Sequence, residues 1–331
     1  MRNNLLYLVI GLGLLLGACS KHNTEQRPTS GDAPISISMK VGDFTRNTRA
    51  ADTDPGSASE RQIDNLYLLL FENTGTNPKR YYVAGATFTG GTWSASEQKI
   101  TLQLTQRQAG MRQVYIIANV DNALKTKLDA VNSITDLTNT VYREIAKPWS
   151  PDIQSPILMS GNKSHDFNAN YQLKFVELTR AVAKVELTIK LSHKFYSMSV
   201  DAIRYRFVDL DKRTYAVKPN TKPDNVVSSS TTLFPNITAW SQWGNSLNLN
   251  PTADFGFGYK EMSAGGTTEL VELKVITYIN ERDTKGAKIE LALYPEDSGI
   301  LPPPEFGPEF YAIPFPDKIE RNYWYRYDIE L

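Results

Sequence analysis

The chain has 331 residues, enough for one large or two ordinary domains, and its 41% hydrophobic content allows buried cores. Lysine plus arginine and aspartate plus glutamate are equal at 36 each, so the formal net charge is zero. Phosphate binding needs a positive excess or a dense basic patch, and the sequence has neither, which argues against nucleic acid as a partner. The single cysteine excludes an internal disulfide.

The N-terminus has the pattern of an export signal. Arg2 supplies a positive start, and an apolar run interrupted only by glycines extends from Leu5 to Leu16. This run is too short to span a bilayer comfortably. The small residues Gly17 and Ala18 then precede the only cysteine, Cys19, as in a bacterial lipobox that is cut before a cysteine whose thiol carries lipid.

We therefore expect a lipoprotein signal peptide at residues 1–18, a lipid on Cys19 and a polar tether over residues 19–34. Ser20 favours the outer membrane over retention at the inner membrane. The alternative is an ordinary signal peptide followed by a chance cysteine.

The first strand is predicted from strict alternation. Ile35, Ile37, Met39 and Val41 share one face of the stretch 35–41, as in a half-buried strand.

A soft, arginine-marked segment separates this strand from the next one. It contains Arg46 and Arg49, is rich in small and polar residues, and leads to a continuous apolar run over Ile63–Phe71 that predicts a central strand. Exposed segments of this kind are preferred sites of proteolytic cleavage. Two interpretations stay open: a surface loop with solvated arginines, or a point where the chain is cut to release the strand 35–41. Arg49 is the first candidate because Ala50 and a soft flank follow it.

Further strands and two short helices are expected in the first half. Strands are predicted over residues 81–88, 99–104 and 113–120, and a helix is predicted by the spacing of Leu124, Leu128 and Val131. Ser133 to Asp136 has the pattern of a capping box, which opens a second helix whose apolar spacing extends to Ile145. The stretch from there to Asn170 is expected to be loop.

The second half is expected to be all β. Residues 171–191 predict one or two long strands broken near Arg180, where we place the boundary between domains at 35–179 and 180–331. A hairpin is predicted from 203–210 and 214–217. Further strands are expected at 270–279, 288–293, 311–315 and 323–331. Short strands separated by turn residues favour β-sandwiches, so the predicted fold class is mostly β, with two β-sandwich domains and short helices in the first.

The final strand is predicted to be amphipathic. One face carries only large apolar and aromatic side chains: Tyr323, Tyr325, Tyr327, Ile329 and Leu331. Such a strand can complete its own sheet, or it can be donated to the sheet of another subunit.

Enzymatic chemistry is not expected. The three histidines are widely separated, and no Gly-x-Ser-x-Gly elbow is present, so we predict no catalytic residues, no metal site and no cofactor. An aromatic-rich region could stack on a glycan or a host protein if exposed, or pack in a core; its residues are Trp240, Trp243, Phe255, Phe257 and Tyr259.

The order of short motifs along the chain resembles the fimbrillins, or type V pilins, of Bacteroidales-type bacteria. After the lipobox, the motifs are Thr48 to Ala50, Ile63 to Phe71, Ile117 to Asn119, Met159 to Gly161, Leu178 to Val185, Thr277 to Glu281 and Ile319 to Tyr323. The resemblance implies two transthyretin-like or immunoglobulin-like β-sandwich domains. It also implies export as a lipoprotein, trimming after an arginine and assembly by donor-strand exchange.

The expected function is therefore that of a fimbrial subunit or accessory cell-surface lipoprotein that supports adhesion. Its expected partners are other fimbrial subunits, in a homo- or hetero-polymer, and the membrane through the lipid anchor. The sequence does not separate stalk, tip and anchor roles. The alternative function is an outer-membrane surface lipoprotein that binds glycans through the aromatic-rich second domain.

Overall fold

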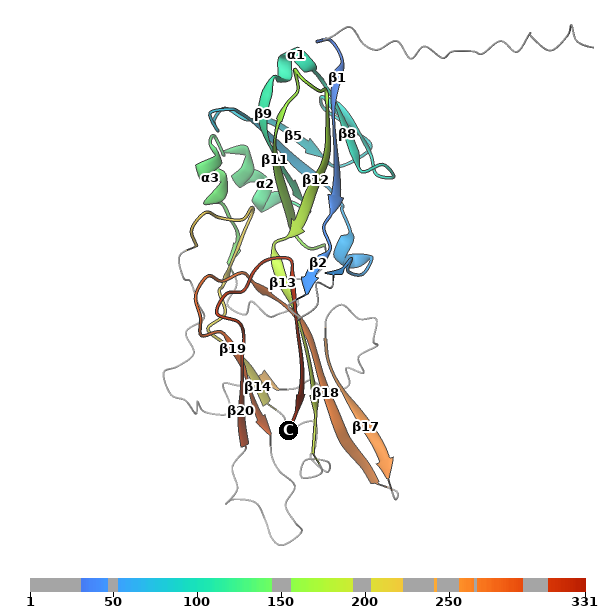
Figure 1. Cartoon of the computed structure of the whole chain (residues 1–331), viewed down its shortest axis with the longest axis vertical. Coiled ribbons are helices and arrows are strands. Elements are labelled where there is room, and N and C mark those ends of the chain that lie inside the picture. The colour runs from blue at the N-terminus through green and yellow to red at the C-terminus, as the bar shows by residue number, and fades with distance from the viewer. Residues whose placement is uncertain are drawn as a thin grey trace, which may run out of the picture.

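The computed structural model describes residues 31–46, 53–144, 156–192, 204–222, 241–242, 256–264, 267–293 and 309–331. The described chain forms two units that follow one another along the long axis of the molecule (Figure 1). Among these residues, strands dominate, and the α-helices are short and belong to the first unit. The predicted fold class is therefore confirmed.

The first unit is built on a nine-stranded sheet with the order β5-β4-β9-β11-β12-β1-β8-β7-β6. In chain order these strands are β1 (Pro34–Val41), β4 (Leu66–Glu72), β5 (Lys79–Val83), β6 (Thr87–Phe88), β7 (Gly91–Ser94), β8 (Lys99–Thr105), β9 (Met111–Ala118), β11 (Met159–Asp166) and β12 (Gln172–Arg180). The expected strand at 81–88 is thus two strands, and β4 begins three residues later than expected.

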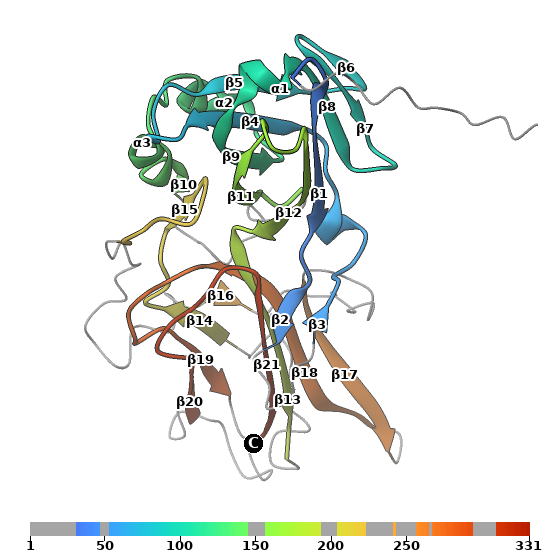
Figure 2. The same cartoon turned by 45° about the horizontal axis from the view of Figure 1, so that its top comes forward.

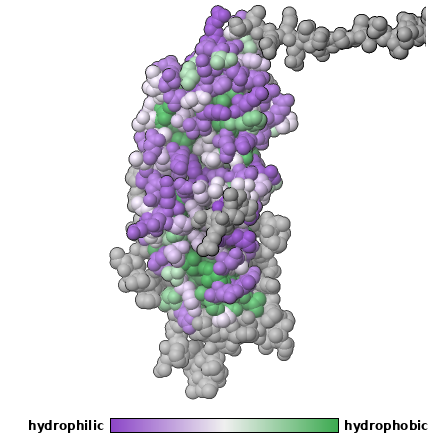
Figure 3. Space-filling model, viewed as in Figure 1, coloured by the Kyte–Doolittle hydropathy of each residue, from purple (hydrophilic) through white to green (hydrophobic). Residues whose placement is uncertain are grey.

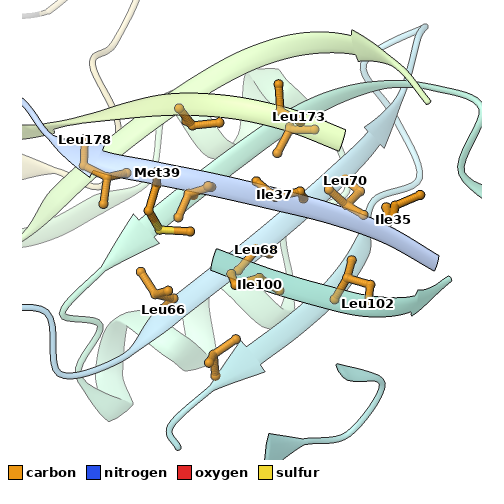
Figure 4. Close-up of a cluster of buried hydrophobic side chains, with 14 of the residues drawn as sticks. Ile35, Ile37, Met39, Leu66, Leu68, Leu70, Ile100, Leu102, Leu173 and Leu178 are labelled. Carbon is orange, nitrogen blue, oxygen red and sulfur yellow. The ribbon is translucent and has the colours of Figure 1, made fainter. Parts of the chain in front are cut away.

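The sheet of the first unit folds over its own core. Side chains of β1 and β8 pack with those of β4, β9 and β12 in one buried cluster. Figure 4 shows β1 crossing over β4, with Ile35, Ile37 and Met39 directed toward Leu68 and Leu70. The continuous apolar run of β4 follows from this arrangement, because its alternate side chains enter a second cluster on the opposite face.

Helices cover that opposite face. They are α2 (Asn122–Asp129) and α3 (Ile134–Thr138), accompanied elsewhere by α1 (Gln106–Ala109) and the short 3-10 helix η1 (Ser59–Arg61). The Asp121 side chain accepts a hydrogen bond from the N–H of Leu124 at the start of α2, and Ser133 and Asp136 form the predicted capping box of α3.

The second unit is a sandwich of two sheets with the orders β17-β18-β13-β21-β2-β3 and β16-β14-β19-β20. The strands are β2 (Phe44–Arg46), β3 (Thr53–Asp54), β13 (Val182–Lys190), β14 (Arg204–Val208), β16 (Ser241–Gln242), β17 (Gly256–Ala264), β18 (Thr267–Asn280), β19 (Lys288–Leu293), β20 (Glu309–Pro314) and β21 (Tyr323–Glu330). Apolar side chains from both sheets form one core between them.

Several segments of the described chain pass from one unit to the other, and two of them form the junction discussed below. The break predicted near Arg180 falls at Ala181, where β12 of the first unit gives way to β13 of the second. The N-terminal segment crosses as well, because β1 belongs to the nine-stranded sheet and β2 lies beside β21 (Figure 2).

Three predictions of local structure are wrong. The second helix ends at Thr138 rather than extending to Ile145, because Val141–Glu144 is a strand, β10, paired with β15 (Arg213–Tyr215). The expected loop before Asn170 contains β11, whose polar residues pair along the whole of β9. The expected hairpin is absent from the described pairings, because β14 pairs with β16 and β19 while β15 pairs with β10.

Candidate functional site

The predicted removable strand, β1, is an interior strand of its sheet. It pairs antiparallel with β8 and parallel with β12. Ile35, Ile37 and Met39 are buried, and Val41 is half-buried against the same cluster. Removing β1 would therefore open a groove with backbone hydrogen-bonding groups on both sides and an apolar floor.

Beyond β1, the chain enters the second unit as β2. Thr45 and Arg46 pair parallel with the first two residues of β21, and Thr45 also pairs antiparallel with Thr53 of β3. Arg46 is half-buried: its guanidinium carbon lies 4.6 Å from the centroid of the Trp324 ring, and its Nη2 lies 3.0 Å from the Asp54 carboxylate. A protease could reach Arg46 only after these contacts open.

Arg49, the first candidate for cleavage, lies outside the described residues, as does Cys19. The segment 47–52 joins β2 to β3, which are neighbouring antiparallel strands at the end of the sheet. It is the covalent link between the β1–β2 segment and the rest of the folded chain.

Phe44 fills a buried pocket where the two units meet. We define the Phe44 pocket by Arg180, Lys184, Tyr278 and Trp324. The guanidinium carbon of Arg180 lies 3.9 Å and the Lys184 Nζ 5.8 Å from the centroid of the Phe44 ring. The Trp324 ring meets it edge-on at 6.5 Å. Cations over an aromatic face are attracted by its quadrupole, and most strongly in a buried site such as this one.

Arg180 is fully buried and donates hydrogen bonds to four acceptors around it. Its Nη1 donates to the carbonyl of Gly42 at 2.8 Å and to Oδ1 of Asn322 at 2.9 Å. Its Nε and Nη2 donate to the carbonyls of Glu60 at 2.8 Å and Pro55 at 3.0 Å. The guanidinium thus binds backbone carbonyls that precede the segment 47–52, at Gly42, and that follow it, at Pro55 and Glu60.

Glu60 provides the buried negative charge of the junction. Its carboxylate lies 2.9 Å from Lys184 Nζ and accepts a hydrogen bond from the Tyr278 hydroxyl at 2.6 Å. Burial opposes ionisation, but the charge of Lys184 and the hydrogen bonds from Tyr278, Lys184 and the Ser57 N–H outweigh it and hold the pKa of Glu60 below its usual value.

The predicted donor strand, β21, lies inside its own sheet in this single chain. It pairs parallel with β13 over Trp324–Glu330. The predicted face is correct: Tyr325 is buried, and the other four residues pack partly buried against the core of the second unit. On the edge away from β13, the described pairings with β2 involve only Tyr323 and Trp324. Donation of β21 to another subunit stays a prediction.

Apolar surface is concentrated near this edge, with which no described strand pairs beyond Trp324. On the face seen in Figure 3, hydrophobic residues concentrate on the second unit, in the part of the view where β20 and β21 lie. Ile329 and Leu331 are only partly buried there, and Phe310 of β20 is 36% exposed.

The remaining candidates are the aromatic-rich region and a possible metal site. Trp240, Trp243 and Phe255 lie outside the described residues, and Phe257 and Tyr259 belong to β17. In the part of the chain that the structure describes, no cluster of three or more potential metal ligands occurs. In the same part, no helix has the length and apolar character needed to cross a membrane.

Sequence reasoning missed the polar side chains of the junction. Glu60 lies in a stretch that has the composition of a surface loop, and Arg180 marked only a domain boundary. Neither residue type is usually buried without partners, and the partners come from segments more than a hundred residues away in sequence. No local sequence pattern predicts such contacts.

Comparisons with known proteins agree with this architecture. The family model of the FimA-type major fimbrial subunit protein matches residues 33–180, and that of the C-terminal part of the minor fimbrium tip subunit MfA4 matches residues 181–330. The minor fimbrium tip subunit MfA4 of Porphyromonas gingivalis is 51% identical over 339 aligned residues, covering 100% of both chains.

Solved structures share the fold. A putative cell adhesion protein from Bacteroides eggerthii superposes with a TM-score of 0.52 at 18% identity, covering 91% of this chain and 86% of that one. One from Parabacteroides distasonis superposes with a TM-score of 0.50 at 15% identity, covering 91% and 90%. The full-length identity to a tip subunit goes further than the fold: this chain belongs to the family of bacterial fimbrial subunits that includes the minor fimbrium tip subunit MfA4.

Proposed function

We propose that this fimbrial subunit accepts a β-strand from a neighbouring subunit after its own first strand has been released by cleavage in the segment 47–52. The observation that carries this proposal is the position of β1. It is a central strand with buried side chains, yet a single short segment joins it and β2 to the rest of the fold. One cut would leave a complete groove and a detachable occupant.

The edge of β21 beyond Trp324, with which no described strand pairs, supports the acceptor role. An incoming strand that replaces β1 and β2 would continue past Trp324 along this edge, where half-buried Ile329 and Leu331 offer apolar surface. Addition of a strand to an open edge combines backbone hydrogen bonds with side-chain burial. Use of the same contact between successive subunits gives a filament rather than a closed ring.

Arg49 is the proposed cleavage site. What favours it over Arg46 is that the Arg46 side chain is held by Asp54 and Trp324 within a paired strand. We further propose that the chain is exported as an outer-membrane lipoprotein with lipid on Cys19, that residues 35–179 and 180–331 act as its two domains, and that it supports adhesion.

The test is cleavage of the full chain with an arginine-specific protease, followed by N-terminal sequencing and native mass spectrometry. The expected product begins at Ala50. Arg49→Ala should block the cut, whereas Arg61→Ala, at an exposed arginine in η1, should not. The cut protein should bind a separately added β1–β2 peptide after its own strand is removed. Resistance of the folded chain to cleavage between β2 and β3, or failure of the peptide to bind, would refute the proposal.

A further inference from the structure

The spacing of buried side chains changes where the N-terminal segment crosses between the units. Within β1 the buried apolar side chains are two residues apart, at Ile35, Ile37 and Met39, with half-buried Val41 continuing the series. The next buried side chain is Phe44, three residues further on. Any strand that occupies both sheets must show the same shift in spacing, from two residues to three. The reason is that the core of the first unit and the core of the second unit lie on different sides of the strand.

Most contacts that hold the walls of the Phe44 pocket do not involve the N-terminal segment. Of the four acceptors of Arg180, only the carbonyl of Gly42 belongs to the segment before residues 47–52. The acceptors on Pro55, Glu60 and Asn322 remain. Lys184 likewise keeps the Glu60 carboxylate as its partner. Release therefore leaves two fixed cations facing the space that the aromatic ring had occupied.

We propose that the Phe44 pocket selects the incoming strand by requiring an aromatic side chain three residues after an alternating apolar stretch. This inference rests on the strand exchange proposed above and adds the chemistry of the partner. An aliphatic side chain would fill the pocket but would offer no π face to Arg180 and Lys184, whereas an aromatic ring satisfies both the volume and the charges.

Backbone contacts on either side of the pocket fix the register. The side-chain amide of Asn322 donates to the backbone carbonyl of Asp43 at 2.7 Å, and the backbone carbonyl of Asn322 accepts from the N–H of Thr45 at 3.0 Å. The side chains of Asp43 and Thr45 are exposed. The pocket therefore constrains one side chain and leaves both neighbours free to vary.

The experiment uses the full chain, cut by an arginine-specific protease and incubated in moderate urea with an excess of fluorescent peptide of residues 33–46. Competition is measured with unlabelled peptides carrying Phe44→Trp, Phe44→Leu or Phe44→Ala, with Thr45→Ala as the matched exposed control. We expect the Ala peptide to compete about 100-fold less well than the natural sequence and the Leu peptide about tenfold less well. The Trp and Thr45→Ala peptides should compete within about threefold of it.

Two failures are distinguishable. If no peptide binds, including the natural sequence, strand acceptance itself is refuted. If the natural peptide binds but the Leu and Phe peptides compete equally, strand acceptance stands and the aromatic requirement is wrong. In a Lys184→Met variant of the full chain, the difference in competition strength between the natural and the Phe44→Leu peptides should be smaller. The peptide series on the natural chain tests the proposal even if that variant does not fold.

Discussion

Replacing Glu60 by glutamine removes one buried charge from the junction at almost constant volume. Glu60 is 1% exposed, and its carboxylate is the ion-pair partner of Lys184, 2.9 Å away. The amide can still accept a hydrogen bond from the Tyr278 hydroxyl, so the principal change is an unpaired ammonium group in a buried site. Removal of one partner of a buried pair costs about 3–5 kcal/mol.

The structure places the expected cost near the lower end of that range. The Lys184 side chain is 9% exposed to solvent, and its Nζ lies 4.6 Å from the centroid of the Trp324 ring. This cation–π contact remains when Glu60 loses its charge. We therefore expect Glu60→Gln to lower the free energy of unfolding by about 3 kcal/mol at neutral pH.

Urea unfolding measures this value, and a double-mutant cycle with Lys184→Met isolates the coupling between the two side chains. The matched control is Glu97→Gln, because Glu97 pairs with Lys99 at a similar 3.0 Å but its side chain is 60% exposed. That substitution should cost at most about 1 kcal/mol. Equal costs at Glu60 and Glu97, or no coupling between Glu60 and Lys184, would refute the reasoning.

The pH dependence gives a second measurement on the same variants. The folded pKa of Glu60 is lowered below its ordinary 4.5, so the unfolded state binds the proton more readily. The ionised carboxylate therefore contributes its stabilisation at pH values above 4.5, and this contribution is lost as the pH falls through the folded pKa. The difference in the free energy of unfolding between the natural chain and Glu60→Gln should therefore decrease as the pH is lowered.

Three further predictions concern the groove and the sheet edge. Ile37→Ala should lower the free energy of unfolding by about 2–5 kcal/mol, whereas Lys40→Ala, on the exposed side of β1, should cost at most about 1 kcal/mol; both are measured by urea unfolding. Gly161→Ala places a Cβ 2.0 Å from a backbone oxygen of β12 and should cost more than about 3 kcal/mol, while Gly85→Ala, with its nearest atom at 4.0 Å, should be nearly neutral by thermal unfolding. Burial raises the pKa of Tyr325 to about 12, so Tyr325 should contribute little to the tyrosine ionisation that is complete by about pH 11. Ultraviolet difference spectra of Tyr325→Phe should therefore match those of the natural chain up to about pH 11 and lose amplitude only above it.

The amphipathic strands could be predicted well because their side-chain period carries the information. Alternation identified β1 and the buried face of β21, and the polar-to-apolar change located β4 within three residues. These patterns are local, and burial on one face of a sheet imposes them directly.

Pairing over long distances could not be predicted in the same way. The apolar spacing after α3 fits a helical period, but β10 forms because a strand more than sixty residues later supplies its partner. The polar sequence of β11 resembles a loop, yet β9 offers it an edge. The alternating sequence predicts the apolar strand that fills the candidate groove. The Phe44 pocket could not be predicted, because it depends on Arg180 and Glu60, whose burial only the tertiary structure shows.

The pairing of β2 with β21 has a consequence for how the chain folds. Contacts between them, such as that of Asn322 with the carbonyl of Asp43, join residues 279 positions apart. Synthesis from the N-terminus makes β1 and β2 first, but their complete binding site exists only once β21 has formed. Non-local contacts of this kind form slowly. We therefore expect a late folding intermediate in which β1 already lies between β8 and β12 while β2 is still unpaired, because only the β2 part of the binding site waits for β21.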